Sequence, residues 1–265
     1  MRAVLAVVLA GCAGADAMTL SAAPPQAAAN SEVGLVPGEN MAFEIKLAGI
    51  TAGEAQLAVG EATTFEGHRA IIVKSRAATA GAAALLKKIT DEATTTIDLD
   101  TGRPLALETF VEMGDRTSTA SARFVGSRAD ITYTRDKNDK PHTMRVDFGK
   151  AVVNDAHAAM AQLRGWKAKP GTTKSVFVVG GRRLWRVDVK FVGESTIASA
   201  YGNRRAVRYE GAAFRAKNNL TVEGDRPQRT FTVWLSDDAD RVPLKVAAST
   251  ELGDIAIELT EYNRP

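Results

Sequence analysis

Apolar and polar residues alternate one by one along several short stretches of this chain. Successive side chains of a β-strand point to opposite faces of the sheet, so a period of two predicts strands with one buried and one solvated face. Such half-buried strands are typical of antiparallel sheets. The alternating stretches are residues 41–47, 54–59, 143–148, 185–191, 230–235 and 255–260. Turn-forming pairs separate them: Gly67-His68, Asn138-Asp139, Gly180-Gly181, Gly202-Asn203 and Gly224-Asp225.

Two segments depart from this alternation and predict short helices. Asn154 or Asp155 can cap the start of the first, and Gly165 can end it. Residues 82–89 predict a weaker helical turn with leucines on one side. We expect both helices to pack under a sheet. The apolar stripe of the first consists of Ala156, Ala159, Met160 and Leu163.

The two halves of the chain carry similar motifs in the same order. Pro37-Gly38 corresponds to Pro170-Gly171, and the Asp-rich turn that ends in Arg103-Pro104 corresponds to the turn that ends in Arg241-Val242-Pro243. This order predicts a duplicated β unit. The expected fold is all-β with minor α content, in which antiparallel curved sheets form open barrels or a sandwich. The predicted parts are a first unit at 37–150, a bridging helix at 151–165 and a second unit at 166–265.

The N-terminus has the pattern of a bacterial lipoprotein leader. Arg2 is followed by the apolar residues 3–10, and Leu9-Ala10-Gly11-Cys12 is a lipobox. We therefore expect a signal peptide at residues 1–11 and an acylated Cys12. A tether at residues 12–36, rich in Ala, Ser, Pro and Gln, would lead to a folded part beginning near Pro37. Ala13 after the cysteine favours the outer membrane over retention at the inner one.

Charge and composition narrow the class of partner. The chain has 34 basic and 31 acidic residues, and its arginine pairs lie in strand-like stretches, so no nucleic-acid partner is expected. No apolar run after residue 10 is long enough for a membrane-spanning helix. Because Cys12 is the only cysteine, the fold has no disulfide to stabilise it.

Metal and nucleophilic chemistry find little support in the sequence. The three histidines His68, His142 and His157 lack metal-binding spacing, and we expect all three on the surface, with no bound metal and no cofactor. No Gly-x-Ser-x-Gly elbow for a serine nucleophile is present.

Carboxylate pairs remain as candidates for cleavage of a glycan. The pairs are Asp98 with Asp100 and Asp237 with Asp238, although neighbouring strand residues point to opposite faces. We expect these aspartates to cap turns, and no catalytic residue is assigned. The candidate binding residues are Trp234, Asp237, Asp238 and Arg241. Trp234 can either cover a neighbouring loop or mark a recognition surface.

Several of these motifs resemble a bacterial family of exported proteins, the domain of unknown function 3108. The resemblance extends from Pro37 to Pro265 and implies an exported, mainly β protein of no assigned activity. The motifs that carry it are Pro37-Gly38-Glu39, Ile50 to Ala55, Asp155 with Leu163-Arg164, Thr232 to Asp238, Arg241-Val242-Pro243-Leu244, Gly253 and Tyr262. His157 and Met160 depart from the pattern, which has an aromatic residue in the central helix.

Together these observations favour an outer-membrane-anchored periplasmic lipoprotein whose β domain binds without catalysis. Its expected partners are the membrane, through the lipid anchor, and an envelope lipid, glycan or protein. The alternatives are a carboxylate-dependent hydrolase of envelope polysaccharide and a structural spacer. An apolar interior space would favour lipid binding. An acidic cleft would favour hydrolysis, and a filled core would favour a structural spacer.

Overall fold

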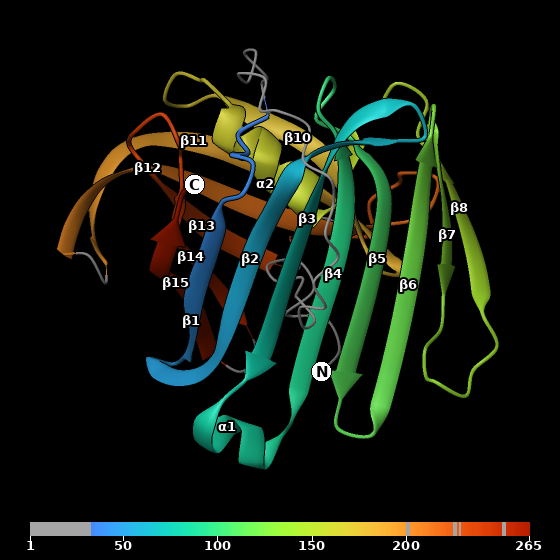
Figure 1. Ribbon diagram of the computed structural model, residues 1–265, viewed down its shortest axis with the longest axis horizontal. Coiled ribbons are helices and arrows are strands. Elements are labelled where there is room, and N and C mark those ends of the chain that lie inside the picture. Colours follow the sequence, from blue (N-terminus) through green and yellow to red (C-terminus); the bar gives the residue numbers. More distant parts are fainter. Residues whose placement is uncertain (1–32, 200–201, 225–226, 228, 251–252) are drawn as a thin grey trace.

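The computed structural model describes residues 33–199, 202–224, 227, 229–250 and 253–265. Strands dominate it, and the all-β prediction is confirmed (Figure 1). The first half contains β1 (Asn40–Leu47), β2 (Ile50–Phe65), β3 (His68–Thr79), α1 (Gly81–Leu86), β4 (Ile89–Asp98), β5 (Pro104–Met113), β6 (Arg116–Val125), β7 (Arg128–Tyr133) and β8 (His142–Asp147). The second half contains β9 (Val153–Asn154), α2 (Ala156–Gly165), β10 (Thr173–Gly180), β11 (Arg183–Ser199), β12 (Gly202–Ala216), β13 (Arg229–Ser236), β14 (Pro243–Thr250) and β15 (Gly253–Asn263).

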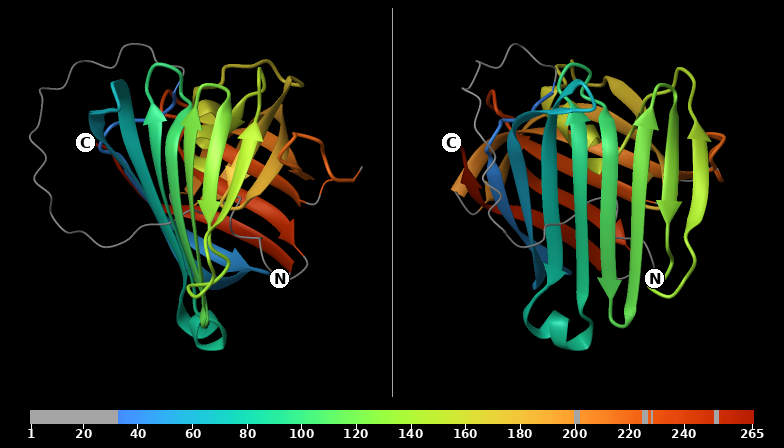
Figure 2. Two further views of the ribbon diagram at one scale, coloured as in Figure 1. Left: turned by 90° about the vertical axis from the view of Figure 1, so that its right-hand side faces the viewer. Right: turned by 45° about the vertical axis from the view of Figure 1, so that its right-hand side comes forward.

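All the described strands form one 15-stranded sheet in the order β8-β7-β6-β5-β4-β3-β2-β1-β15-β14-β13-β12-β11-β10-β9. Neighbours are antiparallel except β9 and β10. The sheet curves so that β1–β8 form one wall and β10–β15 the other, with α2 between them (Figures 1 and 2). Because β1 pairs with β15, the strands of the two predicted units share a single sheet.

β8 and β9 are the two edge strands of the sheet, and packed side chains close the gap between the two edges. Val153, Val179 and Leu184 from one wall pack with Ala122 and Ile131 from the other in one buried cluster. Burial of these apolar groups is the main force that holds the walls together. The result is a barrel-like shell.

Two Asp-rich hairpins have matching local geometry. Asp98 Oδ1 accepts hydrogen bonds from two backbone N–H groups of the β4–β5 turn, and Asp238 Oδ1 does the same in the β13–β14 turn. Pro104 and Pro243 each begin the next strand beside a register shift. Asp98 and Asp238 therefore cap turns, as we expected from the sequence. The duplication of the two units stays a prediction.

The folded region starts earlier than Pro37. Val33 is buried and packs with Ile71, Ile97 and α2, and the Gly34 N–H donates to the Ala161 carbonyl. Val33 and Gly34, which the prediction assigned to the tether, therefore pack on the folded part. Within the part of the chain that the structure describes, no helix has the length and apolar character needed to cross a membrane.

The weaker helix forms at Gly81–Leu86, within and beside the predicted residues 82–89, but it does not pack as predicted. No residue of α1 is buried, and Leu85 and Leu86 are each 89 % exposed. The expectation that this helix packs under the sheet is wrong, because the β3–β4 connection projects beyond the end of the shell (Figure 1).

Candidate functional site

Helix α2 is the element around which the interior is built. Asp155 caps it as predicted: its carboxylate accepts from the backbone N–H groups of His157 and Ala158. One helix face packs through Ala158 and Ala161 on the β2–β4 wall. The opposite face packs through Met160 and Leu163 on the β11–β13 wall. Because walls cover both faces of α2, this helix lacks the solvated face that its single apolar stripe predicted.

The face predicted to be wet holds a buried polar chain. His157 is 6 % exposed, so its assignment to the surface is wrong. Its Nε2 lies within hydrogen-bond distance of Ser75 Oγ, and its Nδ1 lies 2.8 Å from Thr95 Oγ1. Thr95 Oγ1 donates to Asp155 Oδ2 at 2.5 Å. Since the Thr95 proton is used on Asp155, Thr95 accepts from His157 Nδ1–H.

These groups follow one another as in a serine–histidine–acid relay with a threonine inserted before the acid. Ser75 is itself buried and lies outside the lining of the cavity described below. The chain of bonds instead joins α2 to β3 and β4, which makes it a positioning device for the helix.

A buried ion pair fixes the other end of α2. Arg164 donates to both carboxylate oxygens of Glu39, at 2.5 and 2.9 Å, and its side chain also reaches the Asp240 carbonyl. Glu39 is fully buried and Arg164 is 4 % exposed. Tyr262 donates its hydroxyl to Glu39, and burial together with the nearby carboxylates raises the pKa of Tyr262 to about 12. Glu39, Arg164 and Tyr262, which the family resemblance singled out, thus meet in one cluster.

An apolar cavity lies between α2 and the second wall. Its volume is ≈ 110 Å³. Helix α2 and the residue after it contribute Met160, Leu163 and Trp166. The wall contributes inward-facing side chains from three strands: Val176, Val178, Val187, Val189, Phe231 and Val233. Asn154, Gln162 and Lys174 supply the polar part of the lining.

The polar groups sit so that an amphipathic molecule could be oriented. Lys174 is exposed at the mouth, with its ammonium 5.4 Å from the centre of the Trp166 ring. Asn154 and Gln162 bond to each other, and Gln162 also donates to the Gly102 carbonyl, so both amides are held. A cation at the rim of an apolar space suits a ligand with an apolar tail and an anionic head.

A single carboxyl group faces the interior from β4. Asp91 is 4 % exposed and lies between Ala77 and Val111 on the neighbouring strands. Burial, with a smaller contribution from Glu92, raises the pKa of Asp91 to about 7. The group is therefore partly neutral near pH 7.

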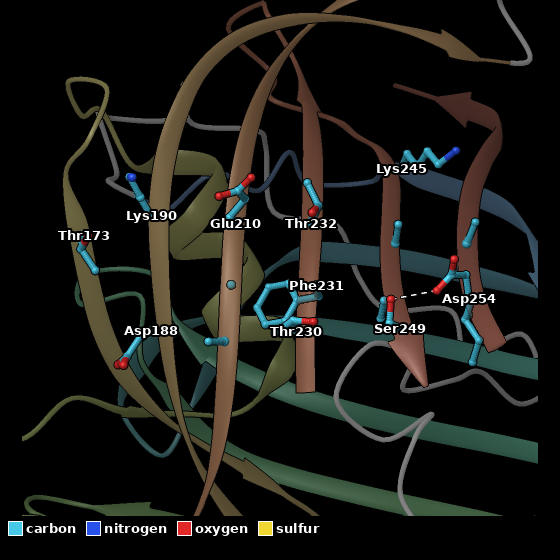
Figure 3. Close-up of a pocket in the computed structure, with 16 residues that line it drawn as sticks. Thr173, Asp188, Lys190, Glu210, Thr230, Phe231, Thr232, Lys245, Ser249 and Asp254 are labelled. Atoms are coloured by element: carbon cyan, nitrogen blue, oxygen red, sulfur yellow. Dashed lines mark hydrogen bonds between the residues drawn. The ribbon is translucent and has the colours of Figure 1, made fainter. Parts of the chain in front are cut away.

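The outer face of the second wall has a broader depression, of ≈ 670 Å³ (Figure 3). Charged and hydroxyl side chains of β10–β15 line it, and α2 lies on the far side of the strands (Figure 3). Three of its charged residues already have partners. Arg186 binds Asp188 and lowers the pKa of that carboxyl group, Arg208 binds Glu210, and Lys245 binds Glu258 at 2.7 Å. The depression is a solvated sheet face rather than an acidic cleft.

The predicted binding residues gather at the β13–β14 hairpin, outside the cavity lining. Asp237 pairs with Arg205 at 2.7 Å and with Arg241 at 3.6 Å, and Asp238 caps the turn. Trp234 is half-buried against an apolar cluster, as expected for a residue that covers its neighbours. The structure brings these four residues together at one hairpin, and their role in binding stays a prediction.

The other candidates are also accounted for by local contacts. His68 binds Asp98, and His142 stacks on Tyr133. Burial would raise the pKa of Asp98, but bonds from the turn backbone and His68 outweigh it and hold that pKa below its usual value. No group of metal-binding side chains occurs among the described residues. Cys12, the predicted lipidation site, lies outside them.

Sequence reasoning missed the cavity, although part of its signal was present. The alternation at 185–191 and 230–235 already assigns Val187, Val189, Phe231 and Val233 to one buried face. Gly211 shapes the same region, because a Cβ there would overlap the ring of Phe231 on the next strand. Periodicity identifies an inward face but not a gap within it.

A family model matches most of this chain, and a solved structure shares its fold. The profile described as "Protein of unknown function (DUF3108)" matches residues 42–260. A beta-barrel-like protein of domain of unknown function DUF1849 from Brucella abortus has a TM-score of 0.58 at 12 % identity, covering 86 % of this chain and 98 % of that one. The hypothetical lipoprotein YmcC from Escherichia coli has a TM-score of 0.29 at 10 % identity, covering 87 % and 86 %. No curated protein matches the sequence significantly.

Proposed function

The chain belongs to the DUF3108 family, whose function is unknown, and from that starting point we propose that it is a lipid-anchored envelope protein that binds an apolar ligand without catalysis. The anchor is Cys12 of the lipobox, and the expected location is the periplasmic face of the outer membrane. The ligand class is an acyl chain or similar apolar group with an anionic end.

The cavity between α2 and the second wall is the observation that carries this proposal. Its volume of ≈ 110 Å³ corresponds to about three or four water-sized groups, at ~30 Å³ each. That space suits the end of an acyl chain rather than a whole drug-sized molecule. Met160 is unbranched and adaptable, so a longer chain can enter by moving it. Lys174 supplies the cation for the head group.

The placement of the polar groups supports binding over hydrolysis. Asp98 and Asp238 are used by their own turns, and the Ser75 relay does not line the cavity. Hydrolysis of a glycan needs two carboxyl groups that face one substrate. Among the described residues, no carboxyl group lines the cavity beside α2, and in the outer depression Asp188 is bound by Arg186 and Glu210 by Arg208.

A cavity-filling substitution tests the proposal. The whole protein is titrated with a fluorescent fatty acid, and Val176→Phe is compared with the wild type. Loss of room for two methylenes, at about 0.8 kcal/mol each, should weaken binding about tenfold. Val125→Phe, the same change at an exposed valine outside the cavity, should bind normally. Binding of the Val176→Phe protein at wild-type affinity contradicts the proposal.

The head-group assignment has its own comparison. Lys174→Gln should weaken binding of the fatty acid while leaving the matching fatty alcohol unaffected, because only the acid carries a charge for the ammonium to meet. Equal loss for both ligands would show that Lys174 acts by packing alone.

The duplication is a second proposal, on the organisation of the chain. We infer that residues 37–150 and 166–265 derive from one β unit. The paired Asp caps and strand-initiating prolines of the β4–β5 and β13–β14 hairpins support it. Superposition of the two halves tests it: the hairpins should align in the same strand order.

A further inference from the structure

The helical tip at the end of the shell is unusually apolar for an exposed element. Leu85 and Leu86 of α1 are each 89 % exposed, and none of the helix is buried. Ile50, in the β1–β2 hairpin, is 73 % exposed at the same end. The Ala80 N–H donates to the Ala52 carbonyl at 3.1 Å, which holds the base of the tip against β2. Leucines gathered this way are the kind of exposed apolar surface that marks an interaction site.

Both charged residues within the tip segment itself are basic. Residues 80–89 read Ala-Gly-Ala-Ala-Ala-Leu-Leu-Lys-Lys-Ile and contain no acidic residue. Lys87 follows the exposed leucines directly. Lys88 is 68 % exposed and contacts Glu112 on β5 at 3.2 Å. Lysine stems can lie along an apolar surface while their ammonium groups stay in water.

We propose that this tip, residues 80–89 with Ile50, inserts into the interface of an anionic phospholipid membrane. The leucines would enter the acyl boundary, and the lysines would meet the phosphate and other anionic head groups above it. A protein partner would need an apolar site framed by acidic groups. A membrane offers both chemistries over any area and needs no shape match to a six-residue helix.

The length of chain before Val33 allows this orientation. Cys12 is separated from Val33 by the 20 residues 13–32, which reach at most about 70 Å when extended. Val33 packs near Gly102, in the turn at the opposite end of β4 from α1. The 12 residues of β3 span about 40 Å. A chain anchored at Cys12, as proposed above, can therefore lay the domain with its tip on the same membrane.

The experiment places a single environment-sensitive dye at the tip. Leu85→Cys in the full-length Cys12→Ser chain carries the only thiol and has no lipid anchor, so the result does not depend on acylation. Val125→Cys in the same chain is the matched control, because Val125 is 57 % exposed and lies at the opposite end of the shell. Both are labelled with a nitrobenzoxadiazole dye and mixed with vesicles of phosphatidylethanolamine and phosphatidylglycerol, or of phosphatidylcholine alone.

We expect a blue shift and quenching by brominated lipid at position 85, none at position 125, and much weaker signals with phosphatidylcholine. In the Cys12→Ser chain, Leu86→Ser should lower partition into the anionic vesicles about tenfold. Lys87→Gln should lower it about fivefold.

Three outcomes overturn the proposal. Equal signals at positions 85 and 125, or none at either, would show that the tip does not insert. A shift at position 85 that grows with protein concentration without vesicles would identify a second copy of the chain as the occupant. An equal shift with both vesicle types would remove the role of the anionic lipid. Cavity binding of fatty acid, measured separately, is unaffected by any of these results.

Discussion

Removal of Arg164 should be the most damaging single change at α2. Arg164→Met keeps the length and apolar stem of the side chain but takes away both hydrogen bonds to Glu39. Glu39 is fully buried, so its carboxylate would lose its cation without gaining water. Breaking one partner of a buried ion pair costs about 3–5 kcal/mol. A domain of ordinary stability has only about 5–15 kcal/mol to lose.

A variant that replaces both Glu39 and Arg164 separates the cost of a buried unpaired charge from the net contribution of the ion pair to stability. Glu39→Leu with Arg164→Met removes both charges, and apolar replacement of a buried pair is often neutral or stabilising. The double variant should therefore be more stable than Arg164→Met alone. Tyr262 would lose its acceptor in that variant, at a cost of about 1 kcal/mol.

Urea denaturation at pH 7, followed by circular dichroism, measures each free energy of unfolding. The four proteins of the cycle should share one m-value, which shows that the same surface is exposed on unfolding. A loss below about 1 kcal/mol for Arg164→Met would refute the reasoning, because the pair would then be effectively solvated. A double variant as unstable as the sum of the two single variants would refute it too, since the charges would be acting independently.

Four further changes test other parts of the structure. Asp91→Asn should leave stability unchanged near pH 4 and raise it by up to about 4 kcal/mol at pH 8 in thermal melts. Burial raises the pKa of Asp91 from 3.8 to about 7, so the folded state binds the Asp91 proton more tightly than the unfolded state does. The wild-type protein therefore loses stability as the pH rises through that range. An equal effect of the substitution at both pH values would contradict this. Asp155→Ala removes the α2 cap and the acceptor for Thr95, and it should lower the free energy of unfolding by about 2 kcal/mol. An unchanged free energy of unfolding would show that the cap is dispensable. Asp238→Ala should cost about 1 kcal/mol by the same assay without altering fatty-acid affinity, and a folded variant that loses binding would restore this hairpin as a site. Cys12→Ser should abolish lipid attachment and release the protein from membranes; wild-type protein found without lipid mass on this residue would disprove the anchor.

The sequence by itself determined the local elements of this protein. Strand periodicity reports which side chains face inward, and each alternating stretch coincides with a strand to within one residue, because the pleat is set by the backbone alone. The same holds for α2, whose start at Asp155 and end at Gly165 follow from capping groups within a few residues. The turns around Asp98 and Asp238 are equally local.

Only the tertiary structure decided how these elements share an interior. One sheet curves around α2, so the helix is covered on both faces. His157 and Arg164 therefore become buried groups that need the partners Ser75 and Glu39 from distant parts of the chain. The cavity exists because α2 and the second wall leave a gap between them, and α1 is exposed because none of the described residues packs over it. These features depend on which distant surfaces meet, and a pattern of near neighbours along the chain carries no information about that.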